Sequence, residues 1–227
     1  MRKAILAMVL ALATITAQAV TIDEITNSDA VAGLKEALEK GAGKAVANLG
    51  KVDGFLANER VKIPLPESLR KAERTLRKYG MDQLADDMIM KMNRAAEEAV
   101  PEAKVLLVDA VKGMSVEDAK GILTGGETSA TEYFRRTTSA PLAEKFRPIV
   151  KEATSKVGLR RSYNNFAGKA SRWGLIGKEQ ASIDDYVTQK ALDGLFVMIA
   201  DEEKAIRANP LEQGSKVITK VFGSLLD

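Results

Sequence analysis

Apolar residues recur at intervals of three and four along most of this chain, and polar residues fill the positions between them. This spacing places the apolar side chains on one face of an α-helix, whereas a strand would need strict alternation. The apolar stripes occupy residues 31–49, 69–79, 84–99, 105–111, 183–206 and 217–225. No stretch alternates convincingly, so the pattern predicts an all-α fold, a single bundle-like domain of roughly eight to ten helices.

The segment over 129–157 is predicted to form two helices. Ser129 and Glu132 have the spacing of a capping box, which predicts a short helix over 130–136. A second helix should follow over 140–157. Pro148 lies inside this second helix, where a missing N–H and a steric clash should kink or divide it.

Prolines and glycines mark the irregular segments. Residues 61–66 should be extended, because each of their two prolines disfavours the helical conformation of the residue before it. Residues 159–166 are predicted as a short helix. The three glycines within 168–181 predict a loop there.

The N-terminus has the three parts of a secretory signal peptide. Arg2 and Lys3 give a cationic start, residues 4–16 are uncharged and mostly apolar, and a small-x-small cleavage site ends at Ala19. The apolar run is short for a membrane span, although a retained anchor helix is the alternative. We expect cleavage after Ala19, export to the periplasm of a Gram-negative cell, no integral membrane segment, and one domain over 20–227.

The composition excludes several classes of function. The chain has no histidine and no cysteine, so Ser-His-Asp and Cys-His catalysis, zinc sites built on imidazole or thiolate, and a lipoprotein anchor are all excluded. We expect no metal and no cofactor. The net charge of +3 includes the two signal-peptide cations, so the rest of the chain is nearly neutral, which argues against nucleic-acid binding.

Residues 121–139 form the first candidate site. They hold the only Gly-Gly pair of the chain, followed by hydroxyl residues at the start of a predicted helix, where free backbone N–H groups can hold an anion. Tyr133, Phe134, Arg135 and Arg136 follow, and the arginines could add a guanidinium fork for phosphate or carboxylate. The alternative is that the glycines and hydroxyls only cap helices and that the arginines pair with nearby glutamates.

Arg160, Arg161 and Tyr163 form a second cluster of the same kind. If the two clusters met in space, they would enclose an aromatic-walled pocket for an anionic small molecule or a lipid headgroup. The sequence does not decide whether they meet.

Two further sets could carry chemistry. Tyr186 and Lys190 are four residues apart on one helix face, with Asp193 three beyond, and a tyrosine beside a lysine can be a proton donor with a lowered pKa. The alternative is a Lys–Asp ion pair beside a half-buried tyrosine. Asn93 and Glu97, also four apart, are surrounded by alanines and could act in acid–base chemistry or lie on a solvated helix face.

Met88, Met90 and Met92 are the closest methionines in the chain. Thioethers are soft ligands that suit Cu(I). Met88 and Met92 share one helix face with other apolar residues, however, so we predict that they fill the core.

Several strings together carry a resemblance. They are Val52-Asp53-Gly54-Phe55-Leu56, Ile63-Pro64-Leu65-Pro66, Met92-Asn93-Arg94-Ala95-Ala96-Glu97, Tyr133-Phe134-Arg135-Arg136-Thr137-Thr138-Ser139, Phe146-Arg147-Pro148 and Tyr186-Val187-Thr188-Gln189-Lys190-Ala191-Leu192-Asp193-Gly194-Leu195-Phe196. In this order they resemble a bacterial exported family catalogued as a domain of unknown function, number four-one-nine-seven. The resemblance implies a helical fold and an exported location. It implies no activity, substrate or catalytic residue.

The sequence favours an exported, non-catalytic helical binding protein for an anionic envelope molecule or a partner protein. One alternative is a homo-oligomeric scaffold that packs through the apolar residues 217–226. Another is an enzyme that uses the tyrosine, lysine and carboxylate side chains named above, which would require them to converge in one cleft.

Overall fold

The computed structural model of the chain describes residues 27–174 and 182–209, which contain eight α-helices, one 3₁₀-helix and no strand. The helices are α1 (Asn27–Leu49), α2 (Glu67–Lys78), α3 (Asp82–Ala99), η2 (Val100–Glu102), α4 (Ala103–Lys112), α5 (Val116–Leu123), α6 (Ser129–Lys156), α7 (Leu159–Arg172) and α8 (Ile183–Ala208). The prediction of an all-α, single-domain fold is confirmed.

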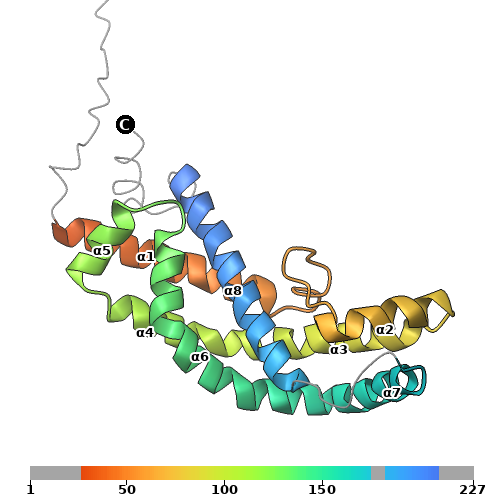
Figure 1. Ribbon diagram of the computed structural model, residues 1–227. Coiled ribbons are helices and arrows are strands. Elements are labelled where there is room, and N and C mark those ends of the chain that lie inside the picture. The colour runs from red at the N-terminus through yellow and green to blue at the C-terminus, as the bar shows by residue number, and fades with distance from the viewer. Residues whose placement is uncertain (1–26, 175–181, 210–227) are drawn as a thin grey trace, which may run out of the picture.

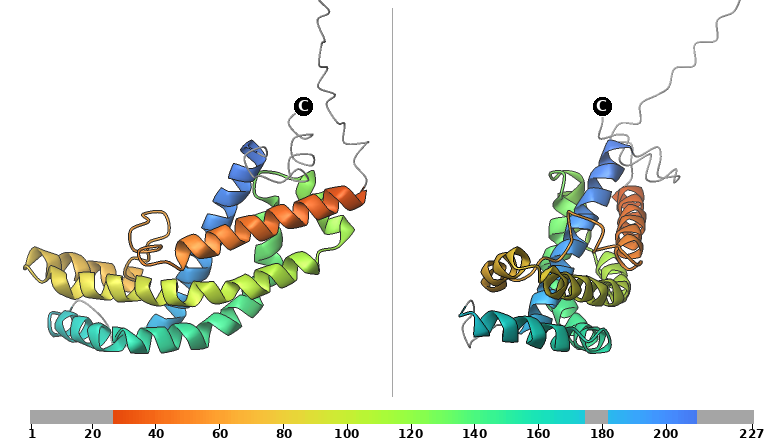
Figure 2. Two further views of the ribbon diagram at one scale, coloured as in Figure 1. Left: turned by 180° about the vertical axis from the view of Figure 1, so that it is seen from behind. Right: turned by 90° about the vertical axis from the view of Figure 1, so that its right-hand side faces the viewer.

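The molecule is elongated and curved (Figure 1). α3, η2 and α4 follow one another as a nearly continuous rod, and α6 and α7 run along the same direction. α1 packs against α4, and α8 crosses the middle of the molecule, where it packs against α1, α3 and α6. The molecule therefore has two ends, which we call the α5 end (α4, α5 and the start of α6) and the α2–α7 end (α2, the start of α3, and α7), as Figure 2 also shows.

The core is built from alanine, leucine and phenylalanine side chains on the facing sides of these helices. Among the largest fully buried side chains are five phenylalanines, Phe55, Phe134, Phe146, Phe166 and Phe196. They come from α6, α7, α8 and the segment between α1 and α2, so each of these parts contributes a large apolar group to one continuous core. Burying a phenylalanine stabilises a fold by about 2–3 kcal/mol, which makes these contacts a major part of the packing.

α6 is one continuous helix from Ser129 to Lys156, so the prediction of two helices, over 130–136 and over 140–157, is wrong, and Pro148 does not divide the second of them. Pro141 and Pro148 both lie inside α6. Each proline removes one backbone hydrogen bond, but Leu142, Phe146 and Val150 remain on a single buried stripe. Packing of that stripe outweighs the local cost of the prolines.

α7 extends further than predicted, to Arg172, and Gly168 lies within it. The buried residues of α7 are Leu159, Ser162, Phe166 and Ala170. They follow each other at intervals of three and four, which is the spacing of one helix face. Because one of these positions is a serine, the pattern of apolar residues alone does not reveal the full helix. Of the predicted loop over 168–181, residues 168–172 are therefore helical and residues 173 and 174 form a turn. Residues 175–181 lie outside the described residues.

Some predictions concern residues that the structure does not describe. The signal peptide over 1–19 and the apolar segment 217–226 both lie outside the described residues. Within 27–174 and 182–209, no helix is long and apolar enough to cross a membrane.

Candidate functional site

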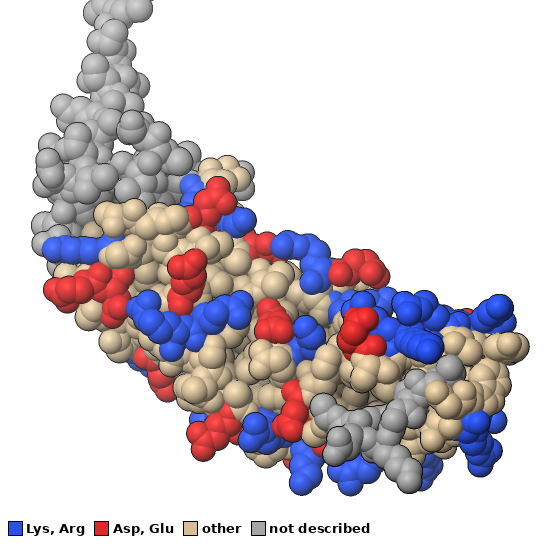
Figure 3. Space-filling model, viewed as in Figure 1, with Lys and Arg blue, Asp and Glu red and all other residues tan. Residues whose placement is uncertain are grey.

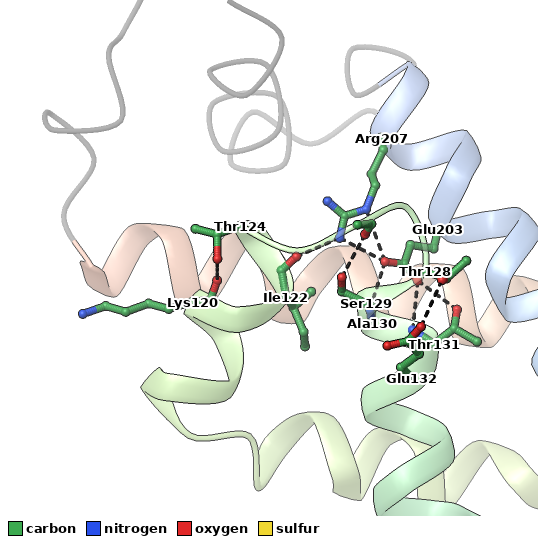
Figure 4. Close-up of polar contacts among 11 residues, drawn as sticks. Lys120, Ile122, Thr124, Thr128, Ser129, Ala130, Thr131, Glu132, Glu203 and Arg207 are labelled. Atoms are coloured by element: carbon green, nitrogen blue, oxygen red, sulfur yellow. Dashed lines mark hydrogen bonds and ion pairs between the residues drawn. The ribbon is translucent and has the colours of Figure 1, made fainter.

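A carboxylate from α8 occupies the start of α6 (Figure 4). The backbone N–H of Ala130 donates to one carboxylate oxygen of Glu203 at 2.9 Å. The backbone N–H and the hydroxyl of Thr131 donate to the other oxygen at 2.9 and 2.8 Å. Glu203 is only 5% exposed. The negative charge that a helix N-terminus favours is thus supplied by the protein itself, and the anion site that the sequence suggested within 121–139 is already filled.

Arg207 joins this carboxylate to α5. Its guanidinium donates to Glu203 at 3.0 and 3.2 Å, one turn earlier on α8, and to the carbonyl of Ile122 at 2.8 Å. Hydrogen bonds between ionised groups are roughly twice as strong as neutral ones. The network therefore ties the end of α5, the start of α6 and α8 together.

The capping box predicted for Ser129 and Glu132 is wrong. The N-cap residue is Thr128, whose side chain makes no cap hydrogen bond, and the Ser129 hydroxyl donates instead to the Gly126 carbonyl at 2.9 Å. Glu203 already satisfies the N–H groups that a capping hydroxyl would take. The helix start is capped from a distant part of the chain, which a local sequence rule cannot detect.

Tyr133 and Phe134 are core residues and present no aromatic surface to a ligand. Tyr133 is 5% exposed, and its hydroxyl donates to the Ala110 carbonyl on α4 at 2.9 Å. Burial raises the pKa of Tyr133 above its ordinary value. Phe134 is completely buried.

Arg135 and Arg136 lie on the surface of α6, but both already have contacts. The Arg135 guanidinium lies 4.6 Å from the centre of the Phe196 ring. Arg136 is 3.2 Å from Asp118 and lies over the Tyr133 ring. Arg136 lines a groove of about 340 Å³ between α5 and α6 that also contains the carboxylates of Glu117, Asp118 and Glu132. Three carboxylates beside one guanidinium repel an anion, so this groove is a poor anion site.

Arg160 and Arg161 are exposed in the first turn of α7, and Tyr163 is half-buried beside them. Arg160 is 4.0 Å from Asp184, a long contact, and Arg161 makes no ion pair with any described residue. Burial raises the pKa of Tyr163.

The two Arg–aromatic clusters do not meet. The first lies near the start of α6 and the second lies beyond its end (Figure 1). At about 1.5 Å per residue, the intervening part of α6 separates them by about 30 Å. The shared pocket that the sequence allowed is therefore not formed.

Asn93 is completely buried and holds an irregular segment, residues 51–66, which we call the clasped segment. Its side-chain oxygen accepts from the Ile63 N–H at 2.8 Å, and its nitrogen donates to the Ile63 carbonyl at 2.9 Å and to the Ile89 carbonyl at 2.7 Å. Residues 62–66 belong to no helix or strand, so their backbone groups need partners of this kind.

Glu97, 4% exposed, holds the other half of the clasped segment. One oxygen accepts from the backbone N–H groups of Phe55 and Leu56 at 3.0 and 3.1 Å, and the other accepts from Arg94 at 2.6 Å. Arg94 also donates to Asp53 at 2.7 Å, and its hydrogen bond to Glu97 raises the pKa of the guanidinium. The hydrogen-bonding capacity of both Asn93 and Glu97 is thus taken up by the fold.

Tyr186 contacts the clasped segment from α8. Its hydroxyl donates to the Pro64 carbonyl at 2.9 Å, and burial raises its pKa. A raised pKa is the opposite of what the proton-donor interpretation requires. Lys190 pairs with Asp193 at 3.4 Å, which is the ion pair that the sequence offered as the alternative.

Met88 and Met92 are completely buried and Met90 is 41% exposed, so the core-filling prediction is confirmed for the first two. Among the described residues, no group of three or more carboxylate side chains is arranged to hold a metal ion.

Positive charge gathers instead at the α2–α7 end. α2 carries five lysines and arginines against two glutamates, and α7 carries four against no acidic residue. These two helices alone exceed the chain's net charge of +3, so the rest of the chain is net negative. Figure 3 shows lysine and arginine side chains concentrated around this end. Of these cations, the sequence motifs pointed only to Arg160 and Arg161, although the charge runs of both helices are visible in the sequence.

Most of these cations have no acidic partner within the described residues. Arg70 pairs with Glu67, and Arg77 pairs with Glu73, Asp82 and Asp86. The exposed cations that make no ion pair there are Lys71, Arg74 and Lys78 of α2, and Arg161, Lys169 and Arg172 of α7. We call the exposed faces of α2 and α7 that carry them the basic surface.

A partly buried polar contact fixes α7, and with it half of the basic surface, to α3. Lys91 donates to Asp87 at 3.0 Å and to Ser162 at 2.7 Å, and the Ser162 hydroxyl also donates to Asp87. Burial raises the pKa of Asp87, but the hydrogen bonds from Ser162 and Lys91 outweigh it, so the pKa lies below its ordinary value. Asp87 is therefore an ionised anchor for α7 at neutral pH.

The all-α fold, with its clasped segment and basic surface, can be placed in a family. The family model described as "Protein of unknown function (DUF4197)" matches residues 24–223, so the chain belongs to this family, as the ordered strings suggested. No curated protein and no solved structure matches the chain.

Proposed function

We propose that this protein is an exported, non-catalytic binding protein that recognises anionic molecules of the cell envelope through the basic surface of α2 and α7. The observation that carries the proposal is a set of six exposed lysines and arginines without acidic partners among the described residues, all on two helices at one end of the molecule. Unneutralised cations gathered at one end of a molecule create a positive potential that attracts anions over a distance of about 8–10 Å in salt.

The state of the other candidate residues supports binding over catalysis. Asn93, Glu97 and Tyr186 bond to the backbone of the clasped segment, and Glu203 bonds to the start of α6. A general acid or base must reach a substrate proton, whereas three of these groups, Asn93, Glu97 and Glu203, are almost completely buried.

Export is part of the proposal. It rests on the cationic, apolar and small-residue parts of the N-terminal sequence, which match a signal peptide. Cell fractionation with N-terminal mass analysis tests it: we expect a periplasmic protein that begins at Val20, and an uncut chain in the cytoplasm would contradict export.

Calorimetric titration of the purified protein with inorganic polyphosphate tests anion recognition. We expect binding that weakens as salt is raised, because exposed charges are screened. The variant K78E/K169E/R172E should bind at least about 100-fold more weakly, since each cation near an anionic surface contributes about 5-fold.

The matched control is K104E/K112E/K120E, which reverses three exposed cations at the α5 end. These residues also make no side-chain ion pair with a described residue. Both variants replace three cations by glutamate, so they change the net charge equally. Equal weakening by the two variants, or no binding by the wild-type protein, would contradict recognition by the basic surface.

A further inference from the structure

Two large aromatic side chains stand exposed at the tip of the α2–α7 end. Tyr79 follows α2 and is 63% exposed, and Trp173 follows α7 and is 43% exposed. Their rings touch edge to face, with centres 5.0 Å apart and planes at 88°. The pair joins two helices that both pack on α3, yet it leaves much of both rings in water, so core packing does not explain it.

Cations of the basic surface adjoin the aromatic pair. Lys78 and Arg172 directly precede the two aromatic residues, and Lys169 lies one turn before Trp173 on the same side of α7. Basic residues in the last turn of a helix also complement its dipole, which accounts for part of this charge. The dipole does not account for the exposed cations in the first turns of the same helices, Arg70 and Arg161 among them.

We propose that this tip docks on the surface of an anionic lipid bilayer, with the Tyr79 and Trp173 rings at the level of the headgroups and the surrounding cations against lipid phosphates. The inference rests on the proposed function, because it names the anion that the basic surface recognises. Tyrosine and tryptophan are the residues enriched where apolar and polar layers of a membrane meet, since each combines an apolar ring with a polar group.

The combination of features favours a bilayer over a soluble polyanion. A soluble polyanion needs only the cations, whereas the exposed aromatic pair gains a less polar environment only at a lipid interface. No described helix could span the bilayer, so the contact is peripheral. Cations alone bind reversibly and are sensitive to salt, so the aromatic pair should add a component that salt does not screen.

Trp173 provides a direct readout, because it is the only tryptophan in the chain. We expect its emission to shift to the blue when vesicles of equal parts phosphatidylglycerol and phosphatidylcholine are added, and not with phosphatidylcholine alone. Phosphatidylglycerol brominated on its acyl chains should quench it. Both measurements use the wild-type protein, so they do not depend on a variant that folds.

The variants then assign the surface. K78E/K169E/R172E should lose the shift and sediment with anionic vesicles at least about 100-fold more weakly, whereas K104E/K112E/K120E should behave like the wild-type protein. The variant Y79S/W173S should keep its binding to polyphosphate but lose most of its sedimentation with the vesicles. Its thermal melting curve should remain cooperative, because both side chains are exposed.

The outcomes separate this inference from the proposed function. Binding to polyphosphate without binding to anionic vesicles would overturn the lipid proposal alone. Vesicle binding without a blue shift or bromine quenching would overturn it as well, because the aromatic pair would then stay in water. If neither polyphosphate nor vesicles bind, both the lipid proposal and the proposed function are wrong.

Discussion

Glu203 takes the place at the start of α6 that an external anion would need. Its carboxylate accepts hydrogen bonds from two backbone N–H groups and one hydroxyl of α6, and it pairs with Arg207. A ligand would have to displace a charged group that is almost completely buried, at the cost of leaving that charge without partners. At the scale of single residues, Glu203 therefore stabilises the fold and does not leave an anion-binding site at the start of α6.

The substitution Glu203→Gln tests this role. The amide can accept with only one oxygen, and its NH₂ group would face N–H groups of α6 that now donate to the carboxylate. We expect a loss of about 2–3 kcal/mol in the free energy of unfolding measured with urea. Glu127→Gln is the matched control, because its side chain is 79% exposed and pairs with Lys204 at a distance of 3.5 Å. Equal stability of the two variants would show that Glu203 does not support the fold.

The sequence singled out several polar residues but could not identify their partners. Asn93 and Glu97 stood out because alanines surround them, and Tyr186 stood out because Lys190 follows four residues later on the same helix face. Their partners are backbone atoms 30, 41 or 42, and 122 positions away in the chain. Helical periodicity predicts which residues share a face, and it carries no information about which distant loop packs on that face.

At the scale of elements, tertiary packing decides where helices begin and end. The sequence predicts a new helix from residue 140 and a kink or division at Pro148, yet α6 is continuous. A serine in the buried face of α7 conceals the length of that helix. In both cases the local preference is worth about 1–3 kcal/mol, which is less than the stabilisation from one well-packed helix face. Helix existence was predictable from the sequence, and the boundaries within 129–172 were not.

The clasped segment approaches α8 closely at Gly194, which gives a second prediction. A Cβ atom added at Gly194 would lie 2.6 Å from the Phe55 ring and 3.3 Å from Val61, both in that segment. We expect Gly194→Ala to lower the free energy of unfolding by about 1–3 kcal/mol, because the segment must shift.

Gly43→Ala is the control for this prediction. Gly43 is also helical, but nothing lies within 4 Å of the position of its added Cβ. Alanine should stabilise this helix by about 0.5–1 kcal/mol. Urea denaturation measures both variants. Stabilisation by Gly194→Ala would show that the clasped segment is not packed on α8 as described.

The contact of Asp87 with Ser162 and Lys91 predicts a pH dependence for the docking of α7. The folded-state pKa of Asp87 is below the ordinary value of 3.8, so its stabilising effect is complete above that pH and is lost as the pH falls through the lower folded-state pKa. Asp87→Asn should therefore be less stable than the wild-type protein at pH 7, and the difference should shrink below about pH 4.

Urea denaturation between pH 7 and pH 3 checks this, with Asp109→Asn as the control. Asp109 is exposed and its side chain makes no ion pair with a described residue. A stability difference for Asp87→Asn that stays constant down to pH 3 would contradict the assigned contact.

At the scale of the whole molecule, the fold separates its charges. Each of α2 and α7 is visibly basic in the sequence, but they are about 80 or more positions apart, and only their packing on α3 brings them to one end (Figures 1 and 2). The sequence therefore revealed the charge of each helix and not the surface that the two form. The same packing places the exposed Tyr79 and Trp173 in contact.

The most direct test of anion recognition by the basic surface is to map the anion contact on the protein by nuclear magnetic resonance. Backbone ¹H–¹⁵N spectra would be recorded as inorganic polyphosphate is added to the purified protein at low salt. If the basic surface recognises anions, the largest shifts fall on the amides of α2 and α7, with little change in α4 and α5. Shifts concentrated at residues 121–139, or spread evenly over the molecule, would contradict it.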